Sequence, residues 1–541
     1  MPNCRFNDQV LPIVVGKTLF EHADTNPAIR VPSSCNRVGT CHECIVQVHE
    51  GIEALTPRTD SEQFLSGNYR LACQAKVIRD DMDINVSTLK RKPKILTASE
   101  VLDVPLDPLT RRSGDRVVRG NNDIDAFDGE VLGLAIDVGT TTVVAQLVDL
   151  TNGKRKLTAA FENPQIFGGS NVLHRINYAN DDPDHELQRV LIGHLNGELR
   201  RMGKRRHIYE AVVTGNPTMR DLFFGLDVHS IGVKPFKSIT EHEMLRGERT
   251  GTWLNASPRD LGLFMNGRGL VYGAPLIACH VGADTAAGVL ATRLFERERP
   301  SMLVDMGTNT EVVVGNKHRL IAASCPAGPA FEGSGLRCGM PGLEGAVESF
   351  RLEDGNPVYS VIGDVTPRGI CGSGVVDILA ELTRNGIVDT VGRFVDGRTE
   401  FVIDREQNIA VDRQDLSQLA QAKAANYAGQ QILLRTFGID WDDLEFLFFS
   451  GGFANYLNVP NAQAIGLIPP IDPAKVMKVG NTALEGAAQM LIDKGLRERI
   501  EQPGRPAPLA GIERGGYRLV WRETPNPFDL GRATDSRTLN L

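Results

Sequence analysis

The stretch LGLAIDVGTTTVVAQLVDL at residues 132–150 returns in shortened form as MLVDMGTNTEVVV at residues 302–314. Aligning Asp137 with Asp305 gives four identities in six positions. In both copies an apolar strand ends in the aspartate, a Gly-Thr turn follows, and a strand rich in β-branched residues comes next. A third strand follows each copy, at 154–161 and at 319–324. Two such units 168 residues apart predict a duplicated α/β fold.

Each turn offers groups that suit phosphate oxygens. A Gly-Thr turn exposes backbone N–H groups and hydroxyls, and an aspartate at the strand end can hold Mg²⁺ through water or orient an attacking water. We therefore expect Asp137 and Asp305 to be catalytic and the two loops to clamp a triphosphate from both sides. The expected nucleotide-binding residues of these loops are Gly139, Thr140, Thr141, Thr142, Gly307, Thr308 and Asn309.

A third element, LEFLFFSGGFANYL at 444–457, predicts a buried strand that ends in Gly451 and Gly452. Two glycines allow the backbone to lie close to a flat ligand such as a nucleoside, although a plain strand-to-helix turn uses them too. The order loop, loop, strand-Gly-Gly resembles the acetate and sugar kinase, Hsp70 and actin superfamily. This resemblance implies an actin-like (ribonuclease H-like) ATPase core with halves at 130–300 and 301–500.

The cysteines are concentrated at the N-terminal end. Cys35, Cys41, Cys44 and Cys73 follow the spacing x5, x2, x28, and a tight triplet with one distant cysteine is typical of a [2Fe–2S] cluster. A zinc site, the alternative, more often uses two close pairs of ligands. Short strands expected at 11–16, at 44–51 and directly after Cys73 predict a β-grasp fold. Residues 1–90 resemble a ferredoxin domain with adrenodoxin-like spacing.

The remaining composition narrows the class of protein. The chain has 541 residues and a net charge of −8, which argues against a nucleic-acid partner. It has neither a run of 18 apolar residues nor a secretory leader, so we expect a cytoplasmic protein that does not enter a membrane. Residues 91–129 are rich in proline and charge and predict a linker without a core. Residues 501–541 form a Pro/Gly-rich tail of no assigned role.

A ferredoxin head joined to such an ATPase resembles the reductive activators of corrinoid-dependent enzymes, nearly from end to end. The resemblance implies ATP with Mg²⁺, a [2Fe–2S] cluster and a one-electron reduction of an inactive Co(II) corrinoid to Co(I). It also implies a corrinoid protein of a methyltransferase system as partner, a separate electron donor, and a homodimer through the ATPase core. Asp284 and Glu332 are weaker candidates for the nucleotide cleft. Further segments that resemble the family are 163–165, 175–176, 215–219, 282–285, 327–333 and 369–374.

Three other functions fit parts of this pattern. One is an ATP-dependent activator of another low-potential enzyme, such as an iron–sulfur dehydratase. A second is a small-molecule kinase with a redox-sensing head, which would release a phosphorylated product. The third is a redox-sensing module that binds ATP without partner-stimulated turnover.

Overall fold

The computed structural model describes residues 2–501 except 8, 27–28, 30, 32, 34, 36, 41–43, 66, 89–103, 170, 278–279, 308, 334, 341, 343, 390 and 453. Contacts within the chain divide these residues into two units. Unit 1 comprises 2–88, 104–287 and 483–501, and unit 2 comprises 288–482. The C-terminal tail beyond 501 lies outside the described residues.

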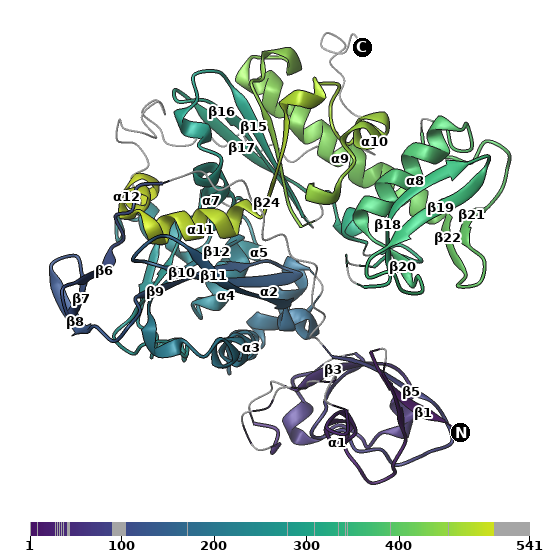
Figure 1. Cartoon of the computed structure of the whole chain (residues 1–541), viewed down its shortest axis with the longest axis horizontal. Helices are drawn as coiled ribbons and strands as arrows, with labels where there is room; N and C mark the ends of the chain where they lie inside the picture. Colours follow the sequence, from purple (N-terminus) through teal and green to yellow (C-terminus); the bar gives the residue numbers. More distant parts are fainter. Residues whose placement is uncertain are drawn as a thin grey trace. The chain divides into compact units, whose positions relative to one another are not determined.

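The N-terminal part of unit 1 is a five-stranded sheet with one short helix (Figure 1). The strand order is β2-β1-β5-β3-β4, with β1 parallel to β5 and the other pairs antiparallel. This arrangement confirms the β-grasp prediction, although the strand expected at 11–16 ends at Pro12. The elements are β1 (Asn3–Phe6), β2 (Gln9–Pro12), α1 (Leu19–Ala23), β3 (Ile45–Glu50), β4 (Tyr69–Leu71) and β5 (Ile84–Thr88).

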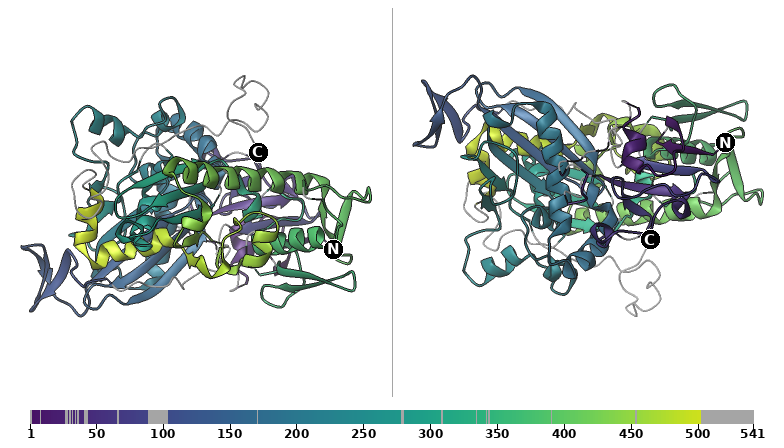
Figure 2. Two further views of the ribbon diagram at one scale, coloured as in Figure 1. Left: turned by 90° about the horizontal axis from the view of Figure 1, so that it is seen from above. Right: turned by 90° about the horizontal axis from the view of Figure 1, so that it is seen from below.

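A small antiparallel sheet at residues 110–126 lies within the segment 91–129, for which the sequence predicted only a linker. Its strands are β6 (Thr110–Ser113), β7 (Arg116–Arg119) and β8 (Asn122–Ala126), seen in dark blue in Figures 1 and 2. Only Thr110 and Val117 of these strands are buried, so the sheet builds almost no core of its own. Arg119 and Arg268 attach it to the next domain by donating to backbone carbonyls.

The first large sheet has the order β11-β10-β9-β12-β14-β13. Strands β9 and β12 of this sheet are parallel to each other and mostly apolar. This composition fits a sheet that helices cover, in which both strands are buried. The strands are β9 (Leu132–Val138), β10 (Thr142–Asp149), β11 (Arg155–Glu162), β12 (Ile208–Gly215), β13 (Leu254–Ala256) and β14 (Leu270–Gly273). The helices of this region are α2 (Val172–Asn180), α3 (Glu186–Met202), α4 (Pro217–Phe223), α5 (His229–Gly232), α6 (Ile239–Leu245) and α7 (Ala283–Ala291).

Unit 2 contains the second large sheet, of order β17-β16-β15-β23-β24. Helix α9 packs on β16 and β17 of this sheet (Figure 1). The strands are β15 (Ser301–Met306), β16 (Thr310–Gly315), β17 (Leu320–Cys325), β23 (Leu447–Ser450) and β24 (Val476–Gly480). Further elements are β18 (Ala346–Glu353), β19 (Asn356–Val361), β20 (Gly369–Ile370), α8 (Gly372–Arg384), β21 (Glu400–Asp404), β22 (Ile409–Asp412), α9 (Arg413–Phe437) and α10 (Val459–Ala464).

The two large sheets share one topology, which confirms the predicted duplication. Strands β11, β10, β9, β12 and β14 correspond in order to β17, β16, β15, β23 and β24, with β13 as an addition at the edge of the first sheet. A helix follows the fifth strand in each case, α7 (Ala283–Ala291) after β14 and α11 (Thr482–Ile492) after β24. Both expected hairpins and both third strands are present.

One boundary differs from the sequence-based domains. Residues 483–501, expected in the second half, belong to unit 1. The reason is the packing of α11 and α12 (Lys494–Glu501): Glu485 pairs with Arg155 at 2.6 Å, and Arg497 pairs with the buried Glu210. These contacts place α11 and α12, the last helices of the described residues, on the first half of the core.

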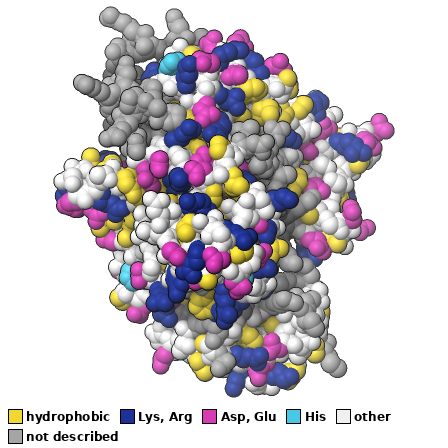
Figure 3. Space-filling view, turned by 60° about the vertical axis from the view of Figure 1, so that its left-hand side comes forward, with side chains coloured by type: hydrophobic (Ala, Val, Ile, Leu, Met, Phe, Trp, Pro, Cys, Tyr) yellow, Lys and Arg dark blue, Asp and Glu magenta, His cyan; other side chains and the backbone are white. Residues whose placement is uncertain are grey.

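The described surface is of mixed charge. On the face shown in Figure 3, Lys and Arg side chains are interspersed with Asp and Glu over most of the area. Within the part of the chain that the structure describes, no helix is both long enough and apolar enough to cross a membrane.

Candidate functional site

Loop 1, residues 139–142, connects β9 to β10 at the carboxyl end of β9. The N–H of Gly139 donates to the carbonyl of Thr142 at 3.0 Å, which closes the turn. Asp137 precedes the loop on β9 and is partly exposed. All the residues that the sequence predicted for this loop therefore lie together at one strand end.

The carbonyls of loop 1 are held by side chains and backbone from outside the loop. Asn163 donates from its side chain to Gly139 O at 2.8 Å and from its backbone N–H to Thr141 O at 2.7 Å. Arg175 on α2 donates to Thr140 O at 2.6 Å. The C=O and the following N–H of a trans peptide point in opposite directions. Anchoring these carbonyls therefore turns the next N–H groups to the other side of the loop, where an anion can bind them.

Arg175 is a deeply buried cation that contacts loop 1 directly. It is 1% exposed, and it also donates to Gly169 O at 2.9 Å. Loss of hydration lowers the pKa of its guanidinium to about 9. The sequence marked Arg175 only as part of a family-like segment, and nothing in its spacing shows that it reaches a loop 35 residues away.

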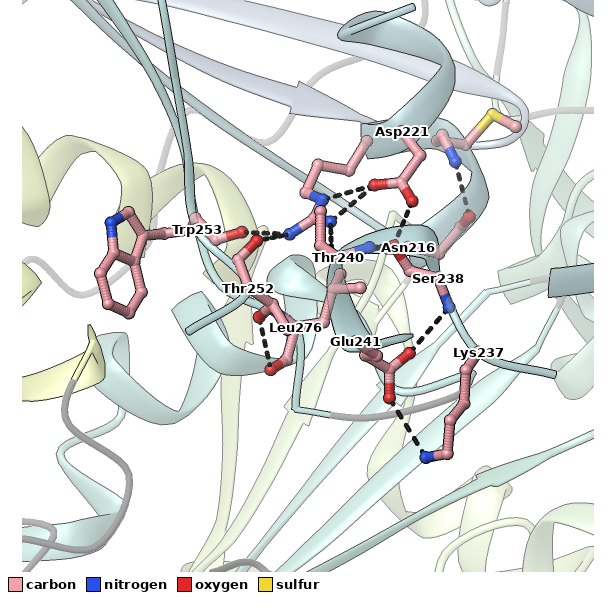
Figure 4. Close-up of polar contacts among 12 residues, drawn as sticks. Asn216, Asp221, Lys237, Ser238, Thr240, Glu241, Thr252, Trp253 and Leu276 are labelled. Atoms are coloured by element: carbon pink, nitrogen blue, oxygen red, sulfur yellow. Dashed lines mark hydrogen bonds and ion pairs between the residues drawn. The ribbon is translucent and has the colours of Figure 1, made fainter. Parts of the chain in front are cut away.

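Helix α4 contributes a third contact to loop 1. Asn216 caps this helix by accepting from Met219 N–H, and its side-chain amide donates to Thr140 Oγ1 at 3.1 Å. Behind it, Figure 4 shows Asp221, Ser238 and Thr240 in one buried polar network. The network includes Arg220, which forms an ion pair with Asp221 and donates to the carbonyls of Thr252 and Ala274. It fixes the start of α4, and thereby Asn216.

Asp284, a weaker candidate from the sequence, lies near the same end of the sheet. A Cβ placed on Gly282 would be 2.5 Å from the Cα of Asn216 and 2.7 Å from Asp284 Oδ1. Asp284 also accepts from Thr285 N–H at 2.7 Å, at the start of α7. The carboxylate thus lies close to the residue that contacts loop 1.

Loop 2, residues 307–309, connects β15 to β16 in unit 2. Gly307 N–H donates to Asn309 O at 3.0 Å, one residue earlier than the corresponding bond of loop 1. A Cβ on Gly307 would lie 3.8 Å from Glu332 Oε1, so the second weaker candidate stands beside this loop. Thr308 lies outside the described residues.

Asp305 precedes loop 2 on β15 and is partly exposed. Loss of hydration raises the pKa of its carboxyl to about 6, and a hydrogen bond from Ser450 on the neighbouring strand opposes that rise. A carboxyl with a pKa near neutrality can accept a proton from an attacking water. This is the property that the proposed catalytic role requires.

Gly451 follows β23 and lies against the end of β15. Its φ is +118°, and a Cβ there would clash with Met306 O. Gly215 has the same place in the first sheet, with φ +152° and a would-be Cβ 2.7 Å from Val138 O. The duplication therefore includes the fourth strand of each sheet, which the sequence analysis did not find. A Cβ on Gly452, by contrast, would meet no atom of the described residues within 4 Å.

Two of the expected cluster cysteines, Cys44 and Cys73, lie next to the ends of β3 and β4. Cys44 and Cys73 are buried with their sulfur atoms 3.3 Å apart, because Ile45 pairs with Leu71 and Ala72 N–H donates to Cys44 O. The hydrogen bond between the two thiols lowers the pKa of Cys73 to about 7. Cys73 lies in the turn after β4 and not directly before a strand as the sequence predicted.

The other two expected ligands are less completely defined. Cys35 is partly exposed, contacts Ser33 Oγ at 3.8 Å, and is near enough to Cys73 to raise the pKa of that thiol. Cys41 lies outside the described residues. The described residues alone assemble no group of three metal-ligating side chains. The donor set nevertheless fits iron–sulfur chemistry, since its described members are all thiols and two of them are adjacent.

A buried ion pair fixes the strand that leads to Cys73. Glu62 accepts from Arg70 at 2.8 and 3.0 Å and from Leu71 N–H at 2.9 Å. Burial favours the neutral carboxyl, but the hydrogen bonds from Arg70 and from Thr59 N–H outweigh it and lower the pKa of Glu62. The charged pair thus holds β4 to the turn at 60–62.

Comparison with known proteins agrees with this architecture. Residues 6–77 match the 2Fe-2S iron-sulfur cluster binding domain, 132–297 the RACo middle region, and 299–505 the C-terminal domain of RACo, the ASKHA domain. Corrinoid activation enzyme RamQ of Eubacterium limosum is 31% identical, over 85% of this chain and 88% of that protein. The chain belongs to the family of RACo-type corrinoid activators.

Two further members of this family support the match. The [Co(II) methylated amine-specific corrinoid protein] reductase of Methanosarcina barkeri is 25% identical over 67% of this chain and 70% of its own. The solved structure of a reductive activator for a corrinoid, iron–sulfur protein is 28% identical and superposes with a TM-score of 0.66, covering 93% of this chain and 94% of that one. The likeness to RACo-type activators thus spans both the ferredoxin and the ATPase parts.

Proposed function

We propose that this protein is an ATP-dependent reductive activator that returns the inactive Co(II) corrinoid of a methyltransferase system to Co(I). The observation that carries the proposal is the union, in one chain, of a ferredoxin domain with adjacent buried thiols and a duplicated core with two Gly-Thr loops. Reductive activation uses both parts, because it needs an electron carrier and a source of free energy. The names of the relatives support the same function.

The four cysteines Cys35, Cys41, Cys44 and Cys73 would hold the [2Fe–2S] cluster. When bound, the cluster supplies one electron at low potential. The buried Cys44 and Cys73 exclude water from one side of this site, and the Glu62–Arg70 pair keeps Cys73 in place. Cys35 is more exposed than Cys44 and Cys73, so we expect a partner protein to approach the cluster from its side.

Loops 1 and 2 would bind the phosphates of ATP and Mg²⁺, with Gly451 and Gly452 beside the nucleoside. Asp305 would accept a proton from the attacking water, and Asp137 would help to hold Mg²⁺ and orient the phosphates. A one-electron transfer that is uphill by about 200 mV costs roughly 5 kcal/mol. ATP-dependent binding that favours one state about 10⁴-fold supplies a similar free energy. The ATPase core would use it to make the cobalt of the docked partner easier to reduce.

The test uses a corrinoid protein trapped as Co(II) and followed by its absorbance. Co(I) is expected only when the reduced activator and ATP are both present. The Cys73→Ser variant, which loses a cluster ligand but leaves the ATPase core intact, should hydrolyse ATP without forming Co(I). Equal Co(I) formation by this variant, or by the intact protein without nucleotide, would reject the proposal.

Two finer points belong to the same proposal. The ferredoxin domain receives its electron from a separate low-potential donor protein, and two copies of the chain associate through the ATPase core. Sedimentation of the purified protein at several concentrations tests the second point. A single species with the mass of one chain at all concentrations would contradict it.

A further inference from the structure

Gln74, the residue directly after the last cluster cysteine, has a side chain directed to the cluster site. Its amide nitrogen lies 3.4 Å from Cys73 Sγ and 3.2 Å from the carbonyl oxygen of Arg37. A carboxamide NH2 group has two donor hydrogens, so one nitrogen can make both bonds. One bond reaches a ligand sulfur and the other reaches the loop that begins at Cys35.

The surroundings fix this side chain in place. Gln74 N–H donates to Leu71 O at 2.9 Å, inside the turn that carries Cys73. Gly39, with φ +86°, lies against it: a Cβ on Gly39 would be 3.1 Å from Gln74 Cδ and 3.0 Å from Ser61 Oγ. The glycine thus leaves the space that the carboxamide fills between the ligand loop and the final ligand.

We propose that Gln74 is a positioning residue that raises the reduction potential of the cluster and fastens residues 37–39 to Cys73. Reduction adds one negative charge to the cluster and its thiolates, and a hydrogen bond to a ligand sulfur stabilises that charge. The inference rests on the proposed [2Fe–2S] site. It goes beyond that site by assigning a role to a side chain that is not a ligand.

The experiment is an EPR-monitored redox titration of the full-length protein with its cluster. Gln74→Leu removes both donors at nearly constant size. At the midpoint potential of the unmodified protein, the ratio of reduced to oxidised cluster should fall about tenfold, which corresponds to a shift of about 59 mV for one electron. Gln74→Glu replaces a donor by a negative charge and should shift the potential at least as far in the same direction.

Gln47→Leu is the matched control. Gln47 is also half-buried in the same domain, but its amide donates to Asn68 at 3.4 Å and to none of the described cysteines. The reduction potential of the cluster in Gln47→Leu should equal that of the unmodified protein within measurement error. A second readout is the rate at which a chelator removes iron from the oxidised protein, which Gln74→Leu should increase several-fold and Gln47→Leu should not.

The outcomes separate this inference from the proposed function. If the unmodified protein lacks the spectrum of a [2Fe–2S] cluster, the proposed cofactor fails and the inference fails with it. If the cluster is present and Gln74→Leu and Gln74→Glu keep its potential, only the inference is rejected. If Gln74→Leu retains no cluster, Gln74→Glu and the shorter Gln74→Asn decide the matter. A reduction potential in both of these variants equal to that of the unmodified protein rejects the inference.

Discussion

Loop 1 and loop 2 have nearly the same sequence but are supported in different ways. In loop 1 three successive carbonyls are anchored, by Asn163 and by the buried cation of Arg175. In loop 2 the turn closes one residue earlier, and the notable group is Asp305, a carboxyl whose pKa is raised to about 6. The first loop is thus built to hold its N–H groups in one orientation, whereas the second places a titrating carboxyl beside its turn.

This difference indicates a division of labour between two copies of one motif. A preorganised set of N–H groups binds phosphate without rearrangement, and a carboxyl near neutral pKa is suited to proton transfer. The residues that follow the fourth strand of each sheet also fit this division of labour. Gly215 is followed by Asn216, which bonds to loop 1, whereas Gly451 is followed by Gly452, which has open space around it. We therefore expect the first copy of the motif to fix the phosphates and the second copy to leave room for the nucleoside.

The largest effect is expected at Asp305. Asp305→Asn should lower kcat for ATP hydrolysis by about 10²-fold or more, because the amide cannot accept a proton. In the unmodified protein kcat/KM for ATP should rise with pH through about 6, since only the deprotonated carboxyl is a base. This rise should be absent from Asp305→Asn and present in Asp137→Asn. A pH profile of Asp305→Asn that still rises near 6 would assign the titration to another group.

The next effect is on stability, at the two glycines that end the fourth strands. Gly451→Ala should lower the apparent Tm more than Gly215→Ala, since the added Cβ approaches Met306 O more closely than the other approaches Val138 O. Each should cost about 1–3 kcal/mol from its backbone conformation alone.

Alanine variants of two other glycines measure this conformational cost without the steric clash. Gly203 and Gly386 also have positive φ, one in each unit, but a Cβ on either would meet no atom within 4 Å. Their alanine variants should therefore be less destabilised than Gly215→Ala and Gly451→Ala respectively. Thermal unfolding followed by circular dichroism measures all four, and equal shifts would remove the clash from the explanation.

The sequence predicted the parts of this site that repeat locally and missed those that depend on the fold. Both hairpins, their aspartates and the strand before Gly451 are readable because apolar periodicity and turn residues are local signals. Asn163 and Arg175 lie 24 and 35 residues along the chain from the carbonyls that they hold, so only the folded structure shows these contacts with loop 1. The correspondence of Gly215 with Gly451 was missed because the likeness is limited to an apolar strand that ends in Thr-Gly in one copy and Ser-Gly in the other.

The same limit explains two differences in organisation. The charged residues of β6 to β8 gave no apolar alternation, since this sheet has little core, and the sequence therefore predicted a linker. Residues 483–501 follow the second sheet in the chain but pair with Arg155 and Glu210 of the first unit. Neither partner is identifiable from the sequence of the helices themselves.

A smaller effect, on binding, is expected at Arg175. Arg175→Met leaves the carbonyls of Thr140 and Gly169 without their donor, so loop 1 should lose its fixed orientation and Kd for ATP should rise about tenfold. The matched control is Arg249→Met, which also removes an arginine that donates to two backbone carbonyls, those of Gly251 and Trp253. Calorimetric titration at a temperature where both variants are folded should show weakened binding for Arg175→Met alone.

The smallest effect should come from Gly452, and it tests the division of labour most directly. A Cβ here meets no protein atom within 4 Å and its φ is not positive, so Gly452→Ala should keep the Tm of the unmodified protein. It should raise Kd for ATP only a few-fold, by crowding the nucleoside, and leave the affinity for inorganic triphosphate unchanged. Arg175→Met should weaken the binding of both ATP and inorganic triphosphate, because Arg175 orients the loop that binds the phosphates. If Gly452→Ala weakened triphosphate as much as ATP, the Gly451–Gly452 turn would be a phosphate contact, and the two copies of the motif would share one task after all.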